Sequence, residues 1–270
     1  MVAAKDLRMS VFWREAGTGP AVVCLHANAS TSGQWRGLTE RLSPRWRVLA
    51  PDLIGAGQSP AWPHAQPVTL GDEARFIEPV LQRAEGPLVL VGHSYGAAVA
   101  LIAALAQPAR VRALVLYEPT LFALIEADGP SPNDADGIRA AVALAGAALD
   151  AGQPEQAAEI FIDYWTGPGS WAATPPARQP AIAAAVGSVR AWSRALFHEP
   201  TPLAALAALT TPVLCLTGQR STAAAHGVTR RLLTVWPHAQ HQVCEGLGHM
   251  GPVTHPAEVN ARIDGFLATL

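Results

Sequence analysis

Short apolar segments recur along the chain and alternate with segments whose apolar residues are spaced as on one face of a helix. The apolar segments are residues 21–27, 46–53, 87–93, 111–119, 211–218 and 241–246. Strands this uniformly apolar are typical of a parallel sheet that is buried on both faces. Helical spacing lies between or after them, at residues 32–42, 69–84, 94–107 and 256–270. The alternation predicts an α/β fold, with a mostly parallel sheet flanked by helices.

The alternation stops at Pro119 and resumes near residue 211. Residues 120–208 are rich in alanine, have helical spacing and contain Gly/Pro-rich loops such as DGPSPNDADG. An insertion of this size is too long for an ordinary loop. We therefore expect a core domain built from residues 1–119 and 209–270, and a helical cap formed by residues 120–208.

Charge and length narrow the class of protein. The chain has 270 residues, half of them apolar, and a formal net charge of −2. It has no basic run that would indicate a nucleic-acid or anionic-membrane partner. We also expect no signal peptide and no membrane span, because neither the N-terminus nor any other stretch has the required apolar run. A small-molecule substrate is the expected partner, and both a monomer and a homodimer remain open.

Cysteines and histidines give no sign of a metal or cofactor site. Cys24, Cys215 and Cys244 each lie in a strand-like apolar segment. An odd number of buried thiols favours reduced, structural cysteines in a reducing compartment, which predicts a cytoplasmic protein. No Cys/His spacing is typical of a metal site, and no flavin or nicotinamide motif is present, so no cofactor is expected.

The sharpest motif is LVLVGHSYGAA, which places Gly92, Ser94 and Gly96 between a buried strand and a helix. A Gly-x-Ser-x-Gly turn in this context holds the serine in a strained conformation at the edge of the sheet. The two glycines are needed because larger side chains would clash in so tight a turn. The following helix directs its positive N-terminal end at the same point. Ser94 is therefore the candidate nucleophile.

With this turn, the sequence resembles the capped α/β-hydrolase superfamily nearly end to end. LHANAS (25–30) resembles the family's His-Gly-x motif, and DLIGAGQS (52–59) its Asp-x-x-Gly-x-Gly-x-Ser turn. The resemblance implies an α/β-hydrolase fold with an eight-stranded type of sheet. It also implies an oxyanion hole formed by the backbone N–H groups of Asn28 and Tyr95. Ala27 stands where the family has glycine, which raises the question of the local φ angle.

The resemblance also assigns a base. His249 lies in the Gly-rich loop of EGLGHMGPVTHP, after the last strand, where the family has its catalytic histidine. A loop beyond the sheet edge can bring a neutral imidazole to the serine hydroxyl. Structural roles are expected for His26, for His93 beneath the turn, and for His255 at the entry to the last helix.

The usual position of the acid, three residues after the glycine of TPVLCLTG, holds Ser221. From Gly218 through Cys244 the sequence contains no Asp or Glu, so no small shift in alignment supplies one. Some members of the family carry the acid after the preceding strand, and Glu118 ends that strand here. Glu245, four residues before His249, is the alternative acid. Ser221 is then expected to be a turn residue or a helix cap.

Aromatic residues of the insertion predict the nature of the substrate. Some of them are expected to line an apolar pocket under the cap, namely Phe122, Phe161, Trp165 and Trp171, with Tyr164 and Trp192 as further candidates. The segment FIDYWTGPGSW contains a single charge, Asp163, which favours small, mainly apolar substrates.

These residues predict a serine esterase with a Ser-His-Glu triad. The serine argues against haloalkane dehalogenases and epoxide hydrolases of the superfamily, which use aspartate. Hydrolysis of a C–C bond in a ring-cleavage diketone stays open, because the insertion contains Arg139, Arg178, Arg190 and Arg194, any of which could bind an acidic group. Cofactor-free perhydrolysis also stays open, as does a non-catalytic binding protein that has lost the usual acid.

Overall fold

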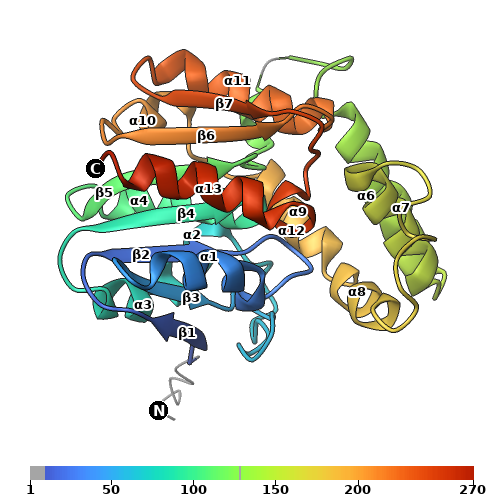
Figure 1. Cartoon of the computed structure of the whole chain (residues 1–270). Helices are drawn as coiled ribbons and strands as arrows, with labels where there is room; N and C mark the ends of the chain where they lie inside the picture. The colour runs from blue at the N-terminus through green and yellow to red at the C-terminus, as the bar shows by residue number, and fades with distance from the viewer. Residues whose placement is uncertain (1–9, 128) are drawn as a thin grey trace, which may run out of the picture.

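A seven-stranded sheet forms the centre of the molecule (Figure 1). The computed structural model describes residues 10–127 and 129–270. The strand order is β1-β3-β2-β4-β5-β6-β7, and β1 alone is antiparallel to its neighbour. The strands are β1 (Trp13–Ala16), β2 (Ala21–Leu25), β3 (Arg47–Pro51), β4 (Leu88–His93), β5 (Val111–Tyr117), β6 (Val213–Gly218) and β7 (Gln240–Cys244).

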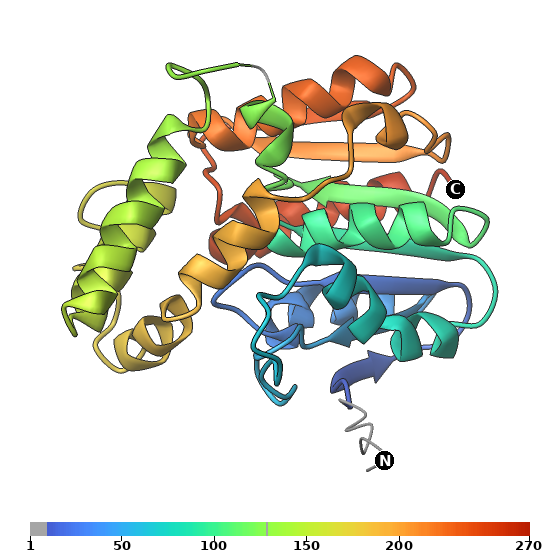
Figure 2. The ribbon, with the colours of Figure 1, turned by 180° about the vertical axis from the view of Figure 1, so that it is seen from behind.

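Helices cover both faces of the sheet, as Figures 1 and 2 show from opposite sides. One face carries η1 (Ser32–Trp35), α1 (Arg36–Leu42) and α13 (Pro256–Leu267). The other carries α2 (Leu70–Phe76), α3 (Glu78–Arg83), α4 (Tyr95–Ala106), α10 (Leu203–Leu206) and α11 (Ala223–Val235). The short α12 (Gly251–Thr254) precedes α13.

The central strands are buried because helices pack on both sides of them. All six residues of β4 are buried, and successive side chains enter different clusters. Leu88 and Leu90 pack with α4, whereas Val89 and Val91 pack with α1 and α13. The continuous apolar run that predicts this strand therefore serves two cores at once.

The segment between β5 and β6 contains helices and loops and, among the residues described, no strand. It contains α5 (Ala123–Glu126), α6 (Asp136–Asp150), α7 (Pro154–Thr166), α8 (Gln179–Val186), α9 (Val189–Phe197) and α10. Helices α6, α7 and α8 stand apart from the sheet, beyond the carboxyl ends of the strands (Figure 1). They share a small core of alanines around Trp171. The segment thus has the position that a cap over an active site needs.

Two sequence expectations need correction. The described residues form seven strands, not the eight-stranded type, because residues 10–20 hold only the short β1 before β2 begins. The pattern of β1, Trp-Arg-Glu-Ala, is half exposed and has no apolar run that could reveal it. The helix expected at 69–84 is two helices with a break at Ile77, and Pro79 occupies the first turn of the second.

One other expectation is confirmed. Cys24, Cys215 and Cys244 are buried and free. Helix α4 is apolar all round because nine of its twelve residues are buried between the sheet and its neighbours. In the part of the chain that is described, no helix is long and apolar enough to cross a membrane.

Candidate active site

Ser94 lies on the tight turn between β4 and α4. Its φ of 55° and ψ of −118° place it in a region that side-chain-bearing residues rarely adopt. The glycines on either side have no room for a side chain. A Cβ on Gly92 would lie 2.5 Å from the Cα of Ala97, and one on Gly96 would lie 2.4 Å from the carbonyl oxygen of Leu25. The two glycines thus allow the strained turn that presents Ser94 at the sheet edge.

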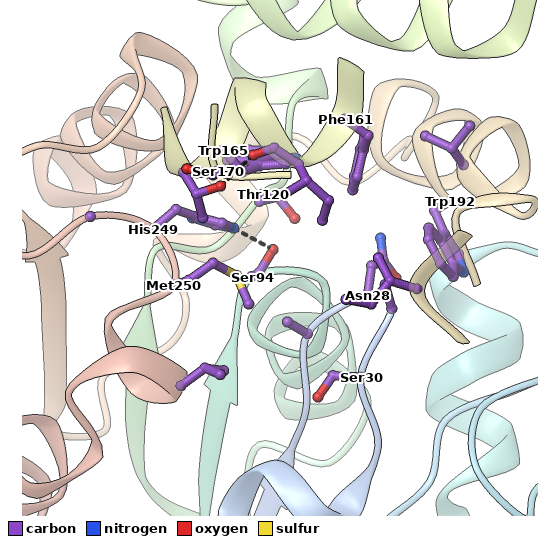
Figure 3. Close-up of a pocket in the computed structure, with 18 of the residues that line it drawn as sticks. Asn28, Ser30, Ser94, Thr120, Phe161, Trp165, Ser170, Trp192, His249 and Met250 are labelled. Carbon is purple, nitrogen blue, oxygen red and sulfur yellow. Dashed lines mark hydrogen bonds between the residues drawn. The ribbon is translucent and has the colours of Figure 1, made fainter. Parts of the chain in front are cut away.

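His249 reaches Ser94 from the loop after β7. Its Nε2 lies 2.9 Å from the Ser94 Oγ, and both side chains are buried. In Figure 3 the dashed line marks this contact at the floor of a cavity. The indole ring of Trp165 stacks on the imidazole with 4.0 Å between ring centroids, so the cap directly covers the histidine.

Glu118 provides the carboxylate that faces the other side of the imidazole. Its Oε2 lies 2.6 Å from the His249 Nδ1, and the residue is fully buried. A carboxylate accepts from Nδ1–H, so Nε2 is left as the acceptor for the serine hydroxyl. Glu118 has a φ of 47°, a strained value for a residue with a side chain. It is thus the second strained residue of the site, after Ser94.

Ser221 contacts the carboxylate from the usual position of the acid. Its hydroxyl donates to the Glu118 Oε1 at 2.5 Å, and the backbone N–H of Gly218 donates to the same oxygen at 2.5 Å. Ser221 does lie in a turn, but it is not the helix cap, because Thr222 caps α11 instead. Glu245, the alternative acid, has an exposed side chain, whereas Glu118 is in contact with His249.

A chain of hydrogen bonds joins the loops that carry the site. The backbone N–H of Ala27 donates to the Gln34 Oε1 at 3.1 Å, and the Gln34 Nε2 donates to the His93 Nδ1 at 3.2 Å. The His93 Nε2 then donates to the carbonyl of His249 at 2.8 Å. Burial lowers the pKa of His93 well below its usual value, so the ring stays neutral and can both accept and donate. His93 therefore connects the loop that holds Ala27 with the loop that holds His249.

Of the two expected oxyanion donors, only Asn28 is among the described residues that line the same cavity. Asn28 lines it together with Ser94. Tyr95 opens α4, so its N–H has no acceptor within the helix. The Tyr95 side chain is buried and its hydroxyl donates to Glu73 at 3.2 Å. The glycine-like φ that the family motif suggests for Ala27 is absent there, and Ala29 instead has a φ of 54°.

Hydrogen bonds between the two other motif segments, residues 25–30 and 52–59, and within them, fix the loop that holds Ala27. His26 donates through Nδ1 to the Ala27 carbonyl at 2.7 Å and accepts the N–H of Leu53 at 3.0 Å. The Asp52 carboxylate accepts the N–H groups of Ser32 at 2.6 Å and Gln58 at 2.9 Å. These contacts bear out the structural role expected of His26.

A cavity of about 550 Å³ opens above Ser94, beneath the cap. Phe122, Phe161 and Trp165 line it as expected, and Trp192 joins them (Figure 3). Trp171 is not among the described lining residues, because it is buried in the alanine core of the cap. Sequence periodicity alone cannot separate the aromatic residues that line the cavity from Trp171, which is buried in the cap.

Charge in the cavity is sparse. Arg178 is the only Arg, Lys, Asp or Glu among the described residues that line it. Arg139 pairs with Glu126 and Asp136, and Arg190 pairs with Asp150, away from Ser94. Asp163, near the end of α7, accepts the N–H groups of two residues that follow this helix, at 169 and 171. Within residues 10–127 and 129–270, no cluster of His, Cys, Asp and Glu could hold a metal ion.

Three residues of the site carry no sequence signal. Gln34 and Ser221 act through long-range contacts, which no local pattern reveals. Thr120 lines the cavity two residues after Glu118, and its buried hydroxyl has no hydrogen-bond partner among the residues described. Its position two residues after Glu118, the candidate acid, is the only hint that the sequence offers.

The chain is similar to known proteins over most of its length. The model of the family described as "alpha/beta hydrolase fold" matches residues 20–256. The chain is 39% identical over 110 residues to lipase LipV of Mycobacterium tuberculosis, a match that spans 40% of this chain and only 41% of that protein. It is 28% identical over 268 residues to the pimeloyl-[acyl-carrier protein] methyl ester esterase of Yersinia enterocolitica, with 95% of this chain and 96% of that protein covered.

A solved structure extends the likeness to the whole fold. The thermophilic esterase from Thermogutta terrifontis superimposes on this chain with a TM-score of 0.74. The superposition covers 96% of this chain and 93% of the esterase chain. At 24% identity, this likeness shows a common fold and nothing finer.

Proposed function

Since the chain belongs to the alpha/beta hydrolase fold family, we propose that it is a serine hydrolase that cleaves carboxylic esters of small, mainly apolar substrates. One observation carries the proposal. A continuous set of hydrogen bonds links Ser94, His249 and Glu118, with 2.9 Å between Oγ and Nε2 and 2.6 Å between Nδ1 and Oε2. This arrangement activates a serine as a nucleophile.

Acylation follows from these contacts. The Ser94 Oγ attacks the ester carbonyl carbon, and His249 takes the hydroxyl proton at Nε2. The carbonyl oxygen becomes negative and is stabilised by the N–H groups of Asn28 and Tyr95 and by the positive end of α4. The imidazolium faces the Glu118 carboxylate. His249 then gives its proton to the departing alcohol, which leaves an acyl group on Ser94.

Deacylation repeats these steps with water. His249 accepts one proton from the water, whose oxygen bonds to the acyl carbon. The bond from that carbon to the Ser94 Oγ breaks, and His249 returns the proton to Ser94. The three donors on Glu118, from His249, Gly218 and Ser221, keep its carboxylate fixed through both halves of the cycle.

The cavity supports the substrate class. A volume of about 550 Å³ is in the range of small-molecule sites, and aromatic and aliphatic side chains form most of its lining. Burying apolar surface there favours an acyl or alcohol group without charge. The placement of a carboxylate against His249 also counts against a binding protein that has lost its acid.

A second candidate rests on Arg178. Because this exposed arginine is the only permanently charged residue described in the lining, it favours substrates that carry a carboxylate remote from the bond that breaks. Acidic esters and ring-cleavage diketones share that feature. Replacing Arg178 with glutamine should raise the KM for a monomethyl dicarboxylate and leave the KM for the matched uncharged methyl ester unchanged. Equal KM changes for both substrates would reject this candidate.

The proposed function is tested with an activity-based label. A fluorophosphonate, which reacts with activated serines, should label the wild-type chain and not the Ser94→Ala variant. Ser43→Ala is the matched control, because Ser43 follows α1 and neither it nor its sequence neighbours line the cavity. Both results should parallel hydrolysis of p-nitrophenyl butyrate. Labelling that persists in Ser94→Ala, or its absence from the wild type, would reject the proposal.

A further inference from the structure

The Thr120 side chain holds a buried hydroxyl that no protein group satisfies. The residue is 2% exposed and lines the cavity with Ser94 and His249. Across the described residues, no donor or acceptor is bonded to its Oγ1. Burying a hydroxyl without a partner destabilises the folded protein, and valine would fill the same space without that penalty. The position thus carries a polar atom whose partner must come from outside the chain.

The hydroxyl lies where the reaction takes place. In Figure 3 Thr120 is directly above the Ser94–His249 contact and its oxygen points toward that pair. Two apolar cap residues cover this contact, since Trp165 stacks on His249 and Phe122 stacks in turn on Trp165. Thr120 therefore supplies a polar atom on the cap side of the nucleophile.

Water is the reactant that needs such an atom. In the resting protein Nε2 is occupied by the Ser94 hydroxyl. Acylation removes that proton, so the water that attacks the acyl group takes its place at Nε2 and donates one hydrogen there. Its second hydrogen needs another acceptor. The backbone N–H groups of Asn28 and Tyr95 are donors only and cannot provide one.

We propose that the Thr120 Oγ accepts the second hydrogen of the deacylating water and, with the His249 Nε2, fixes that water against the acyl carbon. This inference rests on the proposed acyl-enzyme at Ser94. In the step, one O–H bond of the water breaks toward His249 and the other keeps its hydrogen bond to Thr120. A new C–O bond forms as the bond to the Ser94 Oγ breaks. Thr120 touches the reacting water, so its role is catalytic.

Methanol provides the test, because it attacks the same acyl group but has no second hydroxyl hydrogen. The wild type and the variants Thr120→Val and Thr120→Ser are given p-nitrophenyl butyrate in buffer with a fixed amount of methanol. Butyrate and methyl butyrate are then measured. Thr120→Val should lower the ratio of butyrate to methyl butyrate by about three- to tenfold, as expected for one lost hydrogen bond. Thr120→Ser, which keeps the hydroxyl, should stay within about twofold of the wild type.

This product ratio does not depend on how much of a variant folds, and Thr120→Ala can replace Thr120→Val if the latter yields no protein. An unchanged ratio in the variants without a hydroxyl would overturn the inference. A raised KM with an unchanged ratio would also overturn it, by assigning the hydroxyl to the substrate. If the wild type forms no acyl group on Ser94, the proposed function fails and the inference fails with it. If that acyl group forms but the ratio is unchanged, only the inference fails.

Discussion

Replacing Glu118 with glutamine removes the charge that faces His249 while keeping nearly the same shape. The amide can be held in two orientations. In the first, its oxygen keeps the donors from Gly218 and Ser221, and its NH2 group faces the His249 Nδ1. In the second, its NH2 group would point at the Gly218 N–H, and two donors would meet where the native distance is 2.5 Å. The first orientation is therefore favoured.

The favoured orientation puts histidine in the wrong tautomer. An NH2 group next to Nδ1 requires that nitrogen to accept a hydrogen bond, so the imidazole proton moves to Nε2. A protonated Nε2 can no longer accept the hydroxyl proton of Ser94. The same exchange of acid for amide in a Ser-His-Asp triad lowers kcat by about 10⁴-fold. We expect a loss on the order of 10³ to 10⁴, which corresponds to about 4 to 5.5 kcal/mol of transition-state stabilisation.

The assay is steady-state hydrolysis of p-nitrophenyl butyrate, with circular dichroism to verify that the variant is folded. Glu245→Gln is the matched control, because Glu245 is an exposed glutamate in the same region of the chain as His249. Its activity should stay within about twofold of the wild type. If Glu118→Gln keeps more than about a tenth of the wild-type activity, the assignment of the acid and the tautomer argument are both wrong.

Three further predictions follow from the described contacts. Ser221→Ala removes one of the three hydrogen bonds to Glu118 and should lower kcat/KM for the same ester by about tenfold. Ser221→Thr, which keeps a hydroxyl, should retain most of the wild-type kcat/KM. Equal losses in the two variants would refute a role for the hydroxyl. Burial raises the pKa of Glu73 to about 8, so the folded chain holds a proton that the unfolded chain releases above pH ~4.5. Stability should therefore fall as the pH rises from about 4.5 to about 8 and level off above that. Thermal melting of Glu73→Gln should show a smaller fall over the same range, and parallel curves would contradict this. Burial raises the pKa of Cys215 to about 12 and also raises the pKa values of Cys24 and Cys244. A disulfide reagent at pH about 8 should therefore modify none of the three thiols until the chain is denatured. Rapid reaction of the native protein would contradict their burial.

The sequence predicts most of the fold because its central strands and helices follow local rules. The run from Leu88 to His93 is apolar without interruption, and the helix after Ser94 is apolar all round, so both elements are evident from pattern alone. The antiparallel β1 was missed because its residues alternate neither in polarity nor in burial. The number of strands therefore had to come from the structure.

Candidate site residues could be predicted where the signal is local. Ser94 is marked by its glycines, and Glu118 by a charge at the end of an apolar strand. The partner of Glu118 could not be predicted, since Ser221 is 103 residues away and its type is common in turns. Helical spacing likewise could not separate Trp165, which covers His249, from Trp171, which is buried inside the cap.

The central claim is that an acyl group is transferred to Ser94, and rapid quenching tests it most directly. The wild-type chain is mixed with excess p-nitrophenyl butyrate and quenched in acid within the first turnover, and the mass of the intact chain and of its peptides is measured. We predict a burst of p-nitrophenol, a mass increase of one butyryl group per chain, and the increase confined to the peptide that contains Ser94. Turnover of the ester with no butyryl group on that peptide, or with the group on another residue, would contradict the account.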